Sequence, residues 1–240
     1  MGSEYNIYFP EFIINNYNIM NIIIFVHTCK MYEETRAKLI ENTWGNKENI
    51  IFITDNEKST LKNYIYIGEY KTGPTYHPEN VWKMFNIFIK QYNNYDWFMI
   101  IDDDSYLYLN KLEDYLSFFD KDDCYMIGDF LNWVSIRKEP DFTCDYTKWV
   151  SGGPGIVFTK KCIEIFLKLI ITIRVPIINH DVWLHFLYEK SDKRIKRVHC
   201  PGFYQYNAKE LLTKYSKDSN KIISIHLEHN MDLLKEFHNY

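Results

Sequence analysis

The chain has 240 residues, of which 46% are hydrophobic, 18% aromatic and 25% charged. This length and composition allow a full hydrophobic core in one large domain or two merged ones, and exclude disordered, collagen-like and coiled-coil proteins. The formal net charge of -4 argues against a nucleic-acid partner, because proteins that bind a phosphate backbone need an excess of basic residues on one face.

The first half of the chain alternates short apolar runs with helical patterns. The apolar runs predict strands buried on both faces, at 22–26, 50–53, 64–67 and 97–101. Helices are predicted at 32–43, which carries Arg36, and from Pro78, whose apolar stripe faces inward. Strands separated by helices indicate an α/β fold with a mainly parallel sheet, whose ligands bind beyond the carboxyl ends of the strands.

The second half is less regular. Its patterns predict further elements, with helices at 112–119, at 160–173 and from Asp181 onward, and strands at 125–127 and 156–158. Residues 129–148 are expected to form a loop, and residues 151–155 a sharp turn. The basic run at 190–197 is interpreted as the solvated edge of a loop.

Neither the cysteines nor the N-terminal apolar stretch predicts a special feature. The five cysteines include no CxxC pair, so no zinc-site spacing is present, and their odd number leaves at least one thiol free or paired between chains. Four asparagines interrupt the stretch at 12–26, which argues against a membrane span, and the start MGSEYN lacks the basic region of a signal peptide. We therefore expect the chain as given to be soluble.

Asp102, Asp103 and Asp104 follow directly on the apolar run at 97–101. Three successive carboxylates repel one another, and at the ligand edge of a parallel sheet a divalent cation offsets this repulsion while it holds a diphosphate. A solvated acidic turn is the alternative for three aspartates in general. The position after a buried strand favours the metal site.

Three weaker features accompany the triplet. The glycines of SGGPG, at 151–155, allow positive φ and close approach of the backbone to a ligand, although an ordinary tight turn explains them nearly as well. Asp181 is either a helix cap or a general base, and a lone histidine such as His226 is more often a core residue than a ligand. The chain contains no GxGxxG, GxxxxGK[ST] or GxSxG motif, which argues against dinucleotide, P-loop and serine-hydrolase sites.

In their order along the chain, these segments resemble the fringe-like and core-1 β1,3-galactosyltransferase branch of the inverting β1,3-glycosyltransferases (family 31). The resemblance covers about residues 22–237 and is carried by four segments, ETRAKLIENTW (34–44), PENVWKMFNIFIKQYNNYDWFMIIDDDSYLYLNKL (78–112), VSGGPGIVFTKKCI (150–163) and NHDVWL (179–184). It implies a GT-A type, Rossmann-like fold with a mainly parallel central sheet flanked by helices. The expected organisation is an N-terminal extension at 1–20 and a single domain at 21–240, in which 21–110 binds the nucleotide sugar and 111–240 the acceptor.

The resemblance also implies residue roles. Asp181 matches the aspartate that acts as general base, and Asp104 the aspartate that binds manganese. Asp102 would face the uridine ribose and Asp103 the donor sugar. The donor site is completed by residues matched by position, namely Thr28, Arg36, Gly152 and Gly153.

The metal-binding histidine is harder to place by resemblance. The fringe-like FH-x-H motif aligns with FYQY (203–206), which contains no histidine. Other branches use a later strand, and IISIHLEHNMDLL (222–234) resembles that segment, so His226 is expected to be the ligand and His199 is the alternative. His180 stands where the family usually has an acidic residue beside the base.

The implied function is metal-dependent, inverting transfer of a hexose (galactose, N-acetylglucosamine or glucose) from a UDP-sugar to a hydroxyl of a glycan or glycoprotein acceptor, forming a β1,3 linkage. A non-catalytic carbohydrate-binding or chaperone-like member of the fold is the alternative, and the acidic triplet speaks against it. A metal-dependent nucleotidyl or phosphoryl transferase is a weaker rival. Members of the family normally reside in the Golgi behind an N-terminal anchor. We expect a cytoplasmic protein, with viral origin one option, if the chain is complete. If the chain is part of a longer protein, we expect it in the Golgi lumen.

Acceptor recognition is assigned to the loop at 129–148. Four aromatic residues near the predicted site segments are candidates for stacking on sugar rings, namely Trp133, Tyr146, Trp149 and Trp183. For any one of them, packing in the core is favoured over stacking on a sugar. The oligomeric state stays open.

Overall fold

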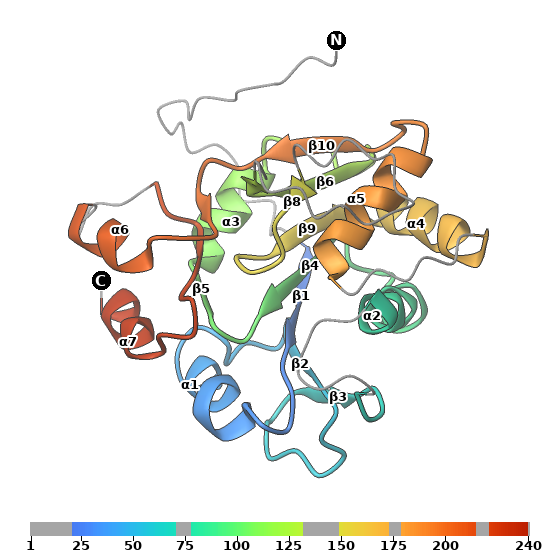
Figure 1. Cartoon of the computed structure of the whole chain (residues 1–240). Coiled ribbons are helices and arrows are strands. Elements are labelled where there is room, and N and C mark those ends of the chain that lie inside the picture. The colour runs from blue at the N-terminus through green and yellow to red at the C-terminus, as the bar shows by residue number, and fades with distance from the viewer. Residues whose placement is uncertain (1–20, 71–77, 132–148, 173–178, 215–220, 240) are drawn as a thin grey trace, which may run out of the picture.

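A computed structural model of the chain describes residues 21–70, 78–131, 149–172, 179–214 and 221–239. Its centre is a seven-stranded sheet with the order β10-β6-β9-β4-β1-β2-β3 (Figure 1). The strands are β1 (Ile22–His27), β2 (Ile50–Thr54), β3 (Tyr64–Tyr66), β4 (Trp97–Asp102), β6 (Tyr125–Gly128), β9 (Ile156–Thr159) and β10 (Lys196–His199). Only β9 runs antiparallel to its neighbours, so the predicted mainly parallel α/β sheet is confirmed.

The predicted strands are confirmed because strands with helices on both faces are apolar along their whole length. Every residue of β1 and β2 is buried. The edge strand β10 was not predicted, and reading all of 190–197 as a loop edge was wrong. In β10 an exposed Lys196 alternates with a buried Val198, and charged residues on an outer strand discourage pairing with other chains.

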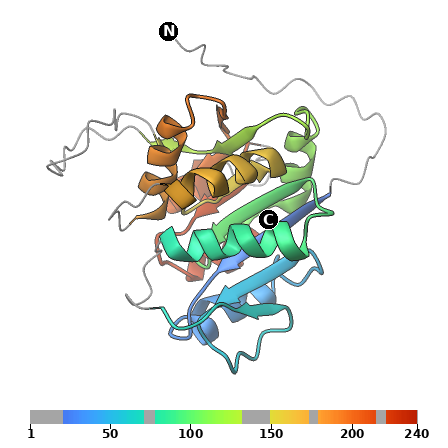
Figure 2. The ribbon, with the colours of Figure 1, turned by 90° about the vertical axis from the view of Figure 1, so that its right-hand side faces the viewer.

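Three helices cover one face of the sheet, namely α2 (Pro78–Gln91), α4 (Lys160–Thr172) and α5 (His180–Lys190). Figure 2 shows them side by side in front of the strands. Ile23 and Phe25 of β1 point into this layer. Phe85 of α2 stacks on Phe166 of α4, with ring centroids 6.0 Å apart, which ties the helices together above the sheet.

The opposite face carries shorter elements. A helical segment, η1 (Glu33–Ala37) followed by α1 (Lys38–Glu41), falls within the predicted helix at 32–43. The other elements of this side are helices α3 (Leu109–Leu116), α6 (Ala208–Lys214) and α7 (Asp232–His238), and a three-stranded sheet of β11 (Phe203–Tyr204), β12 (Ser224–His226) and β5 (Ser105–Leu107). This small sheet was not predicted.

The remaining described strands, β7 (Phe130–Leu131) and β8 (Trp149–Val150), pair with each other. The extension at 1–20 and the loop residues 132–148, with Trp133 and Tyr146, lie outside the described residues. Among the residues that are described, Cys29, Cys124, Cys162 and Cys200 are free thiols. None of the described helices has the length and apolar character needed to cross a membrane.

Candidate active site

The acidic triplet lies where the main sheet meets the small one. Strand β4 ends at Asp102, opposite His27 of β1, and β5 begins at Ser105. Asp103 and Asp104 form the turn between them, and they are only 5% and 2% exposed. Buried carboxylates need charged or hydrogen-bonding partners, and the surrounding elements supply them.

Asp103 is held by two of the residues that the resemblance assigns to the donor site. The Thr28 hydroxyl donates to Oδ2 of Asp103 at 2.7 Å, and the Arg36 guanidinium donates to Oδ1 at 3.1 Å. Burial and the neighbouring Asp104 charge raise the pKa of Asp103 to about 6, against the lowering effect of these two donors. Thr28 and Arg36 thus contact the triplet directly, through Asp103.

Asp104 has three partners that carry or can carry positive charge. Arg36 donates to its Oδ2 at 3.1 Å, and Nε2 of His226 lies 3.1 Å from its Oδ1. His229 contacts Oδ2 through Nδ1. Burial by itself raises the pKa of Asp104, but the hydrogen bond and charge of His226 outweigh it, with Arg36 and His229 adding to the effect. The pKa is held at about 2.

Asp102, Asp104 and His226 form a group suited to a metal ion. Each offers one ligand atom, and these atoms all lie within 4.8 Å of one another. The pairing of β12 with β5 brings them together, because His226 lies opposite Ser105, the residue after Asp104. Two carboxylate oxygens and one imidazole nitrogen suit divalent cations such as Mn²⁺. Asp102 therefore lies with the ligand group, whereas the side chain of Asp103 faces Thr28 and Arg36.

The alternative histidine, His199, lies elsewhere. Its Nδ1 accepts a hydrogen bond from the backbone N–H of Phe130 at 3.2 Å and is 3.7 Å from Asp129. His229, in contrast, reaches the triplet although the sequence did not predict it. It is in the left-handed region, with φ of 69°, and its side chain is 72% exposed. Its only signal in the sequence is that it lies three residues after His226.

The turn at 151–155 connects the ligand group to α5, and its glycines leave room for neighbouring side chains. A Cβ on Gly152 would lie 2.2 Å from Nε2 of His180, and one on Gly153 would lie 2.6 Å from Oε1 of Gln205. Positive φ occurs at Gly155 (97°), not at the two predicted glycines. The positive φ expected at Gly152 and Gly153 was therefore wrong, because close packing and not φ requires glycine there. Close approach of their backbone to a ligand stays a prediction.

Gly153→Ala should lower stability by roughly 1–3 kcal/mol, as expected when atoms are forced into a packed region. The new Cβ would meet Gln205, and also Cγ of His226 at 2.8 Å. Combining it with Gln205→Ala should cost less than the sum of the two single changes, because the amide that collides is removed. Urea unfolding of all four proteins checks this. Strictly additive losses would contradict the packing account.

Asp181 is in the first turn of α5, directly after His180, the residue that Gly152 packs against. Its Oδ2 accepts a hydrogen bond from Nε1 of Trp149 at 3.2 Å, and its Oδ1 accepts one from the N–H of Val182 at 2.8 Å. Trp149 and Trp183 are each 4% exposed, so they pack in the core as favoured from the sequence. Trp149 also orients the carboxylate of Asp181.

Two buried histidines lie behind the site. His27 ends β1, with Asn80 3.3 Å from its Nε2 and the Tyr70 ring stacked on it, and His180 begins α5. Burial lowers the pKa of His27 to about 3, aided by the charge that His180 can carry. Burial also lowers the pKa of His180 to about 4, against the opposing effect of Asp181.

These shifts predict a loss of stability in acid. The pKa of His27 lies below its ordinary value of 6.5, so between pH 6.5 and 3 the unfolded chain binds more protons than the folded one. Stability should fall as the pH drops through this window, by up to about 1.4 kcal/mol per pH unit for this group. His27→Gln should flatten that slope, whereas His238→Gln, at an exposed histidine, should leave it as in the wild type. Equal slopes in all three proteins, from urea unfolding without divalent cations, would refute the prediction.

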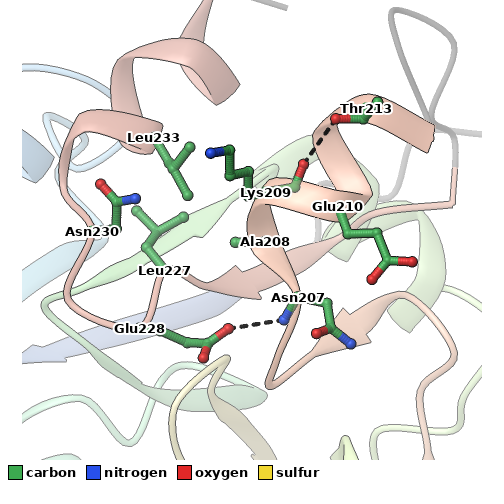
Figure 3. A pocket seen from close by; sticks show the side chains of 9 residues that line it. All are labelled: Asn207, Ala208, Lys209, Glu210, Thr213, Leu227, Glu228, Asn230 and Leu233. Atoms are coloured by element: carbon green, nitrogen blue, oxygen red, sulfur yellow. Dashed lines mark hydrogen bonds between the residues drawn. The ribbon is translucent and has the colours of Figure 1, made fainter.

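A separate hollow of about 550 Å³ lies between α6 and the turn that precedes α7 (Figure 3). At its lower edge in the figure, Glu228 reaches the backbone of Asn207, whose N–H donates to Oε1 of Glu228 at 2.9 Å. Its lining residue Leu227 follows His226 and donates its N–H to the Asp104 carbonyl at 2.8 Å. The hollow therefore borders the ligand group, but none of the site residues predicted from the sequence lines it.

A family model described as Fringe-like matches residues 17–235. The chain belongs to the Fringe-like family. Two curated relatives are β-1,3-glucosyltransferases. The Homo sapiens protein is 21% identical over 221 residues, which are 90% of this chain and 42% of that protein. The Mus musculus protein is 24% identical over 144 residues, or 60% and 28%. The chain spans less than half the length of the curated relatives it matches.

This Fringe-like chain is also similar to a solved structure. A glycosyltransferase involved in glycosylation of the major capsid of PBCV-1 superposes with a TM-score of 0.46 at 12% identity, covering 91% of this chain and 100% of that one. The family match confirms the resemblance to the fringe-like branch that the sequence shows. The GT-A fold expected of that family agrees with the observed α/β layers and mainly parallel sheet.

Proposed function

We propose that this Fringe-like chain transfers a hexose from a UDP-sugar to a hydroxyl of a glycan or glycoprotein acceptor, with inversion and a β1,3 linkage. The observation that carries the proposal is the group of Asp102, Asp104 and His226, within 4.8 Å of one another at the ligand edge of the sheet. Two carboxylates and an imidazole held this close together favour metal-dependent transfer over a scaffold that binds only sugar.

The residues present fit a manganese ion. Asp104 and His226 are the proposed principal ligands, and Asp102 lies close enough to serve as a third ligand or to reach the ribose. A divalent cation bound there supplies positive charge that favours departure of the UDP diphosphate. Arg36 adds a fixed positive charge on the same side, because its guanidinium bonds both Asp103 and Asp104.

Asp181 is the proposed general base. Its carboxylate would take the proton from the acceptor hydroxyl as that oxygen attacks the anomeric carbon from the face opposite UDP. A single displacement of this kind inverts the anomeric centre. Oδ2 of Asp181 accepts the hydrogen bond from Trp149, and Oδ1 accepts one from the N–H of Val182 at the start of α5. Together these bonds hold the carboxylate in one orientation.

The proposed division of labour assigns donor binding to residues 21–110 and acceptor binding to residues 111–240. Thr28, Arg36 and the triplet lie in the first part, and Asp181 in the second. His226 crosses this division, since it belongs to the second part and reaches Asp104 through the pairing of β12 with β5.

A panel of UDP-sugars, incubated with Mn²⁺ or with EDTA and a set of glycan acceptors, tests the proposal. Release of UDP with one sugar and with Mn²⁺ only is the expected result, and the product's anomeric configuration should be β. Release of UMP or pyrophosphate would favour a nucleotidyl transferase. UDP binding without any turnover would favour the non-catalytic alternative.

A further inference from the structure

Gln205 lies directly after β11 and contacts both Ser151 of the glycine turn and His226 of the ligand group. Oγ of Ser151 donates to its Oε1, which turns its Nε2 toward Nδ1 of His226, 3.0 Å away. The backbone carbonyl oxygen of Gln205 lies 3.3 Å from the same ring nitrogen. One residue therefore offers His226 a donor from its side chain and an acceptor from its backbone.

Gln205 is itself fixed in place. Its backbone N–H donates to Oδ2 of Asp129 at 3.0 Å, and the carbonyl of Asp129 accepts the N–H of Ser151 at 2.8 Å. Gly153 closes the space on the other side, where a Cβ would collide with the Gln205 amide. The amide is thus confined between the glycine turn and His226 of β12, while Asp129 fixes the backbone of Gln205, so a shift of the amide would require these contacts to break.

The second nitrogen of His226 makes this arrangement useful. Its Nε2 faces Oδ1 of Asp104 at 3.1 Å, on the side of the ligand group. A neutral imidazole has one N–H, so binding a cation through Nε2 places that hydrogen on Nδ1. Nδ1 then needs an acceptor, which the Gln205 carbonyl provides, and in the other tautomer it needs a donor, which the Gln205 amide provides. Histidine ligands in metal sites are usually oriented by such a partner on the second nitrogen.

We infer that Gln205 is a positioning residue that orients the His226 ring for metal binding and keeps its Nδ1 hydrogen-bonded in both tautomers. The inference rests on the proposed function, because it takes His226 as a ligand. It also gives the SGGPG turn a role, since Ser151 holds the amide and Gly153 leaves space for it. The segment FYQY at 203–206 lacks the histidine of the FH-x-H motif. Its Gln205 instead orients His226, which belongs to another strand, β12.

Two substitutions separate positioning from packing. Gln205→Met keeps the length of the side chain and removes its hydrogen bonds to Ser151 and His226, so the side chain no longer fixes the ring, although the backbone carbonyl stays. Gln205→Glu keeps a side-chain acceptor for Nδ1 and for the Ser151 hydroxyl. Mn²⁺ binding, measured from the electron paramagnetic resonance signal of the free ion, should weaken roughly 10- to 100-fold in Gln205→Met. Gln205→Glu should bind Mn²⁺ as well as the wild type. In turnover assays the methionine variant should show a raised KM for Mn²⁺ with little change in kcat.

Asp104→Asn is measured alongside, to show that the Mn²⁺ signal reports this group. If Asp104→Asn binds Mn²⁺ like the wild type, the proposed metal site itself fails. If Asp104→Asn loses binding and Gln205→Met does not, only the inference about Gln205 fails. Equal weakening by methionine and glutamate, together with equal falls in melting temperature, would assign Gln205 a packing role and overturn the inference as well.

Discussion

Asp181→Asn should lower the rate of sugar transfer by roughly 10²- to 10⁴-fold, the usual contribution of a positioned general base. Asparagine keeps an oxygen that accepts the hydrogen bond from Nε1 of Trp149, so the start of α5 should stay in place. It cannot take a proton from the acceptor hydroxyl. UDP affinity, measured by calorimetry with Mn²⁺ present, should be unchanged, because Asp181 lies in a different element from the proposed metal ligands.

Two controls sharpen this test. Trp149→Phe keeps the carboxylate and removes only its indole donor, so it should reduce kcat far less than Asp181→Asn does. Asp123→Asn removes a surface carboxylate paired with Lys196, before the start of β6 and away from the ligand edge, and should leave the rate unchanged. If Asp181→Asn kept full activity, the base assignment would be wrong and another group would have to accept the proton.

Asp104→Asn should abolish the response to manganese and lower transfer by roughly 100-fold or more. Loss of a charged ligand removes several kcal/mol of stabilisation for the departing diphosphate, and each 1.4 kcal/mol, roughly, is a tenfold change in rate. Asparagine has nearly the same volume, so the turn between β4 and β5 should fold normally. The rate of UDP release against Mn²⁺ concentration checks the prediction.

Asp103→Asn is the matched control. Asp103 is equally buried, but its side chain faces Thr28 and Arg36 and not the ligand group. Its replacement should therefore change donor affinity more than the Mn²⁺ concentration needed for half-maximal activity. An Asp104→Asn protein that still responded to Mn²⁺ like the wild type would contradict the assignment of Asp104.

The main sheet could be predicted from the sequence because its central strands are buried on both faces. Continuous apolar runs such as 22–26 and 97–101 are then required, and they are easily seen. The small sheet gave no such signal. Its strands β5, β11 and β12 have two or three residues each, too few to show a period, and they form by pairing with one another across long stretches of chain.

In the site, too, some residues have a signal in the sequence and others depend on the folded structure. The acidic triplet was found from its place after a buried strand, and Thr28 and Arg36 from resemblance. His226 was chosen by resemblance among two candidates, and its distance of 3.1 Å from Asp104 depends on the register of β12 against β5. Gln205 has no signal in the sequence, because hydrogen bonds from Ser151 and to His226, and not its residue type, place it beside the site.

We propose that Asp104 and His226 hold the cation that binds the UDP diphosphate. Diffraction from crystals grown with Mn²⁺ and UDP, collected where manganese scatters anomalously, tests this most directly. We expect one anomalous peak within ligand distance of both side chains, in contact with the diphosphate. UDP bound at the carboxyl ends of β1 and β4 without a peak between these residues would contradict it.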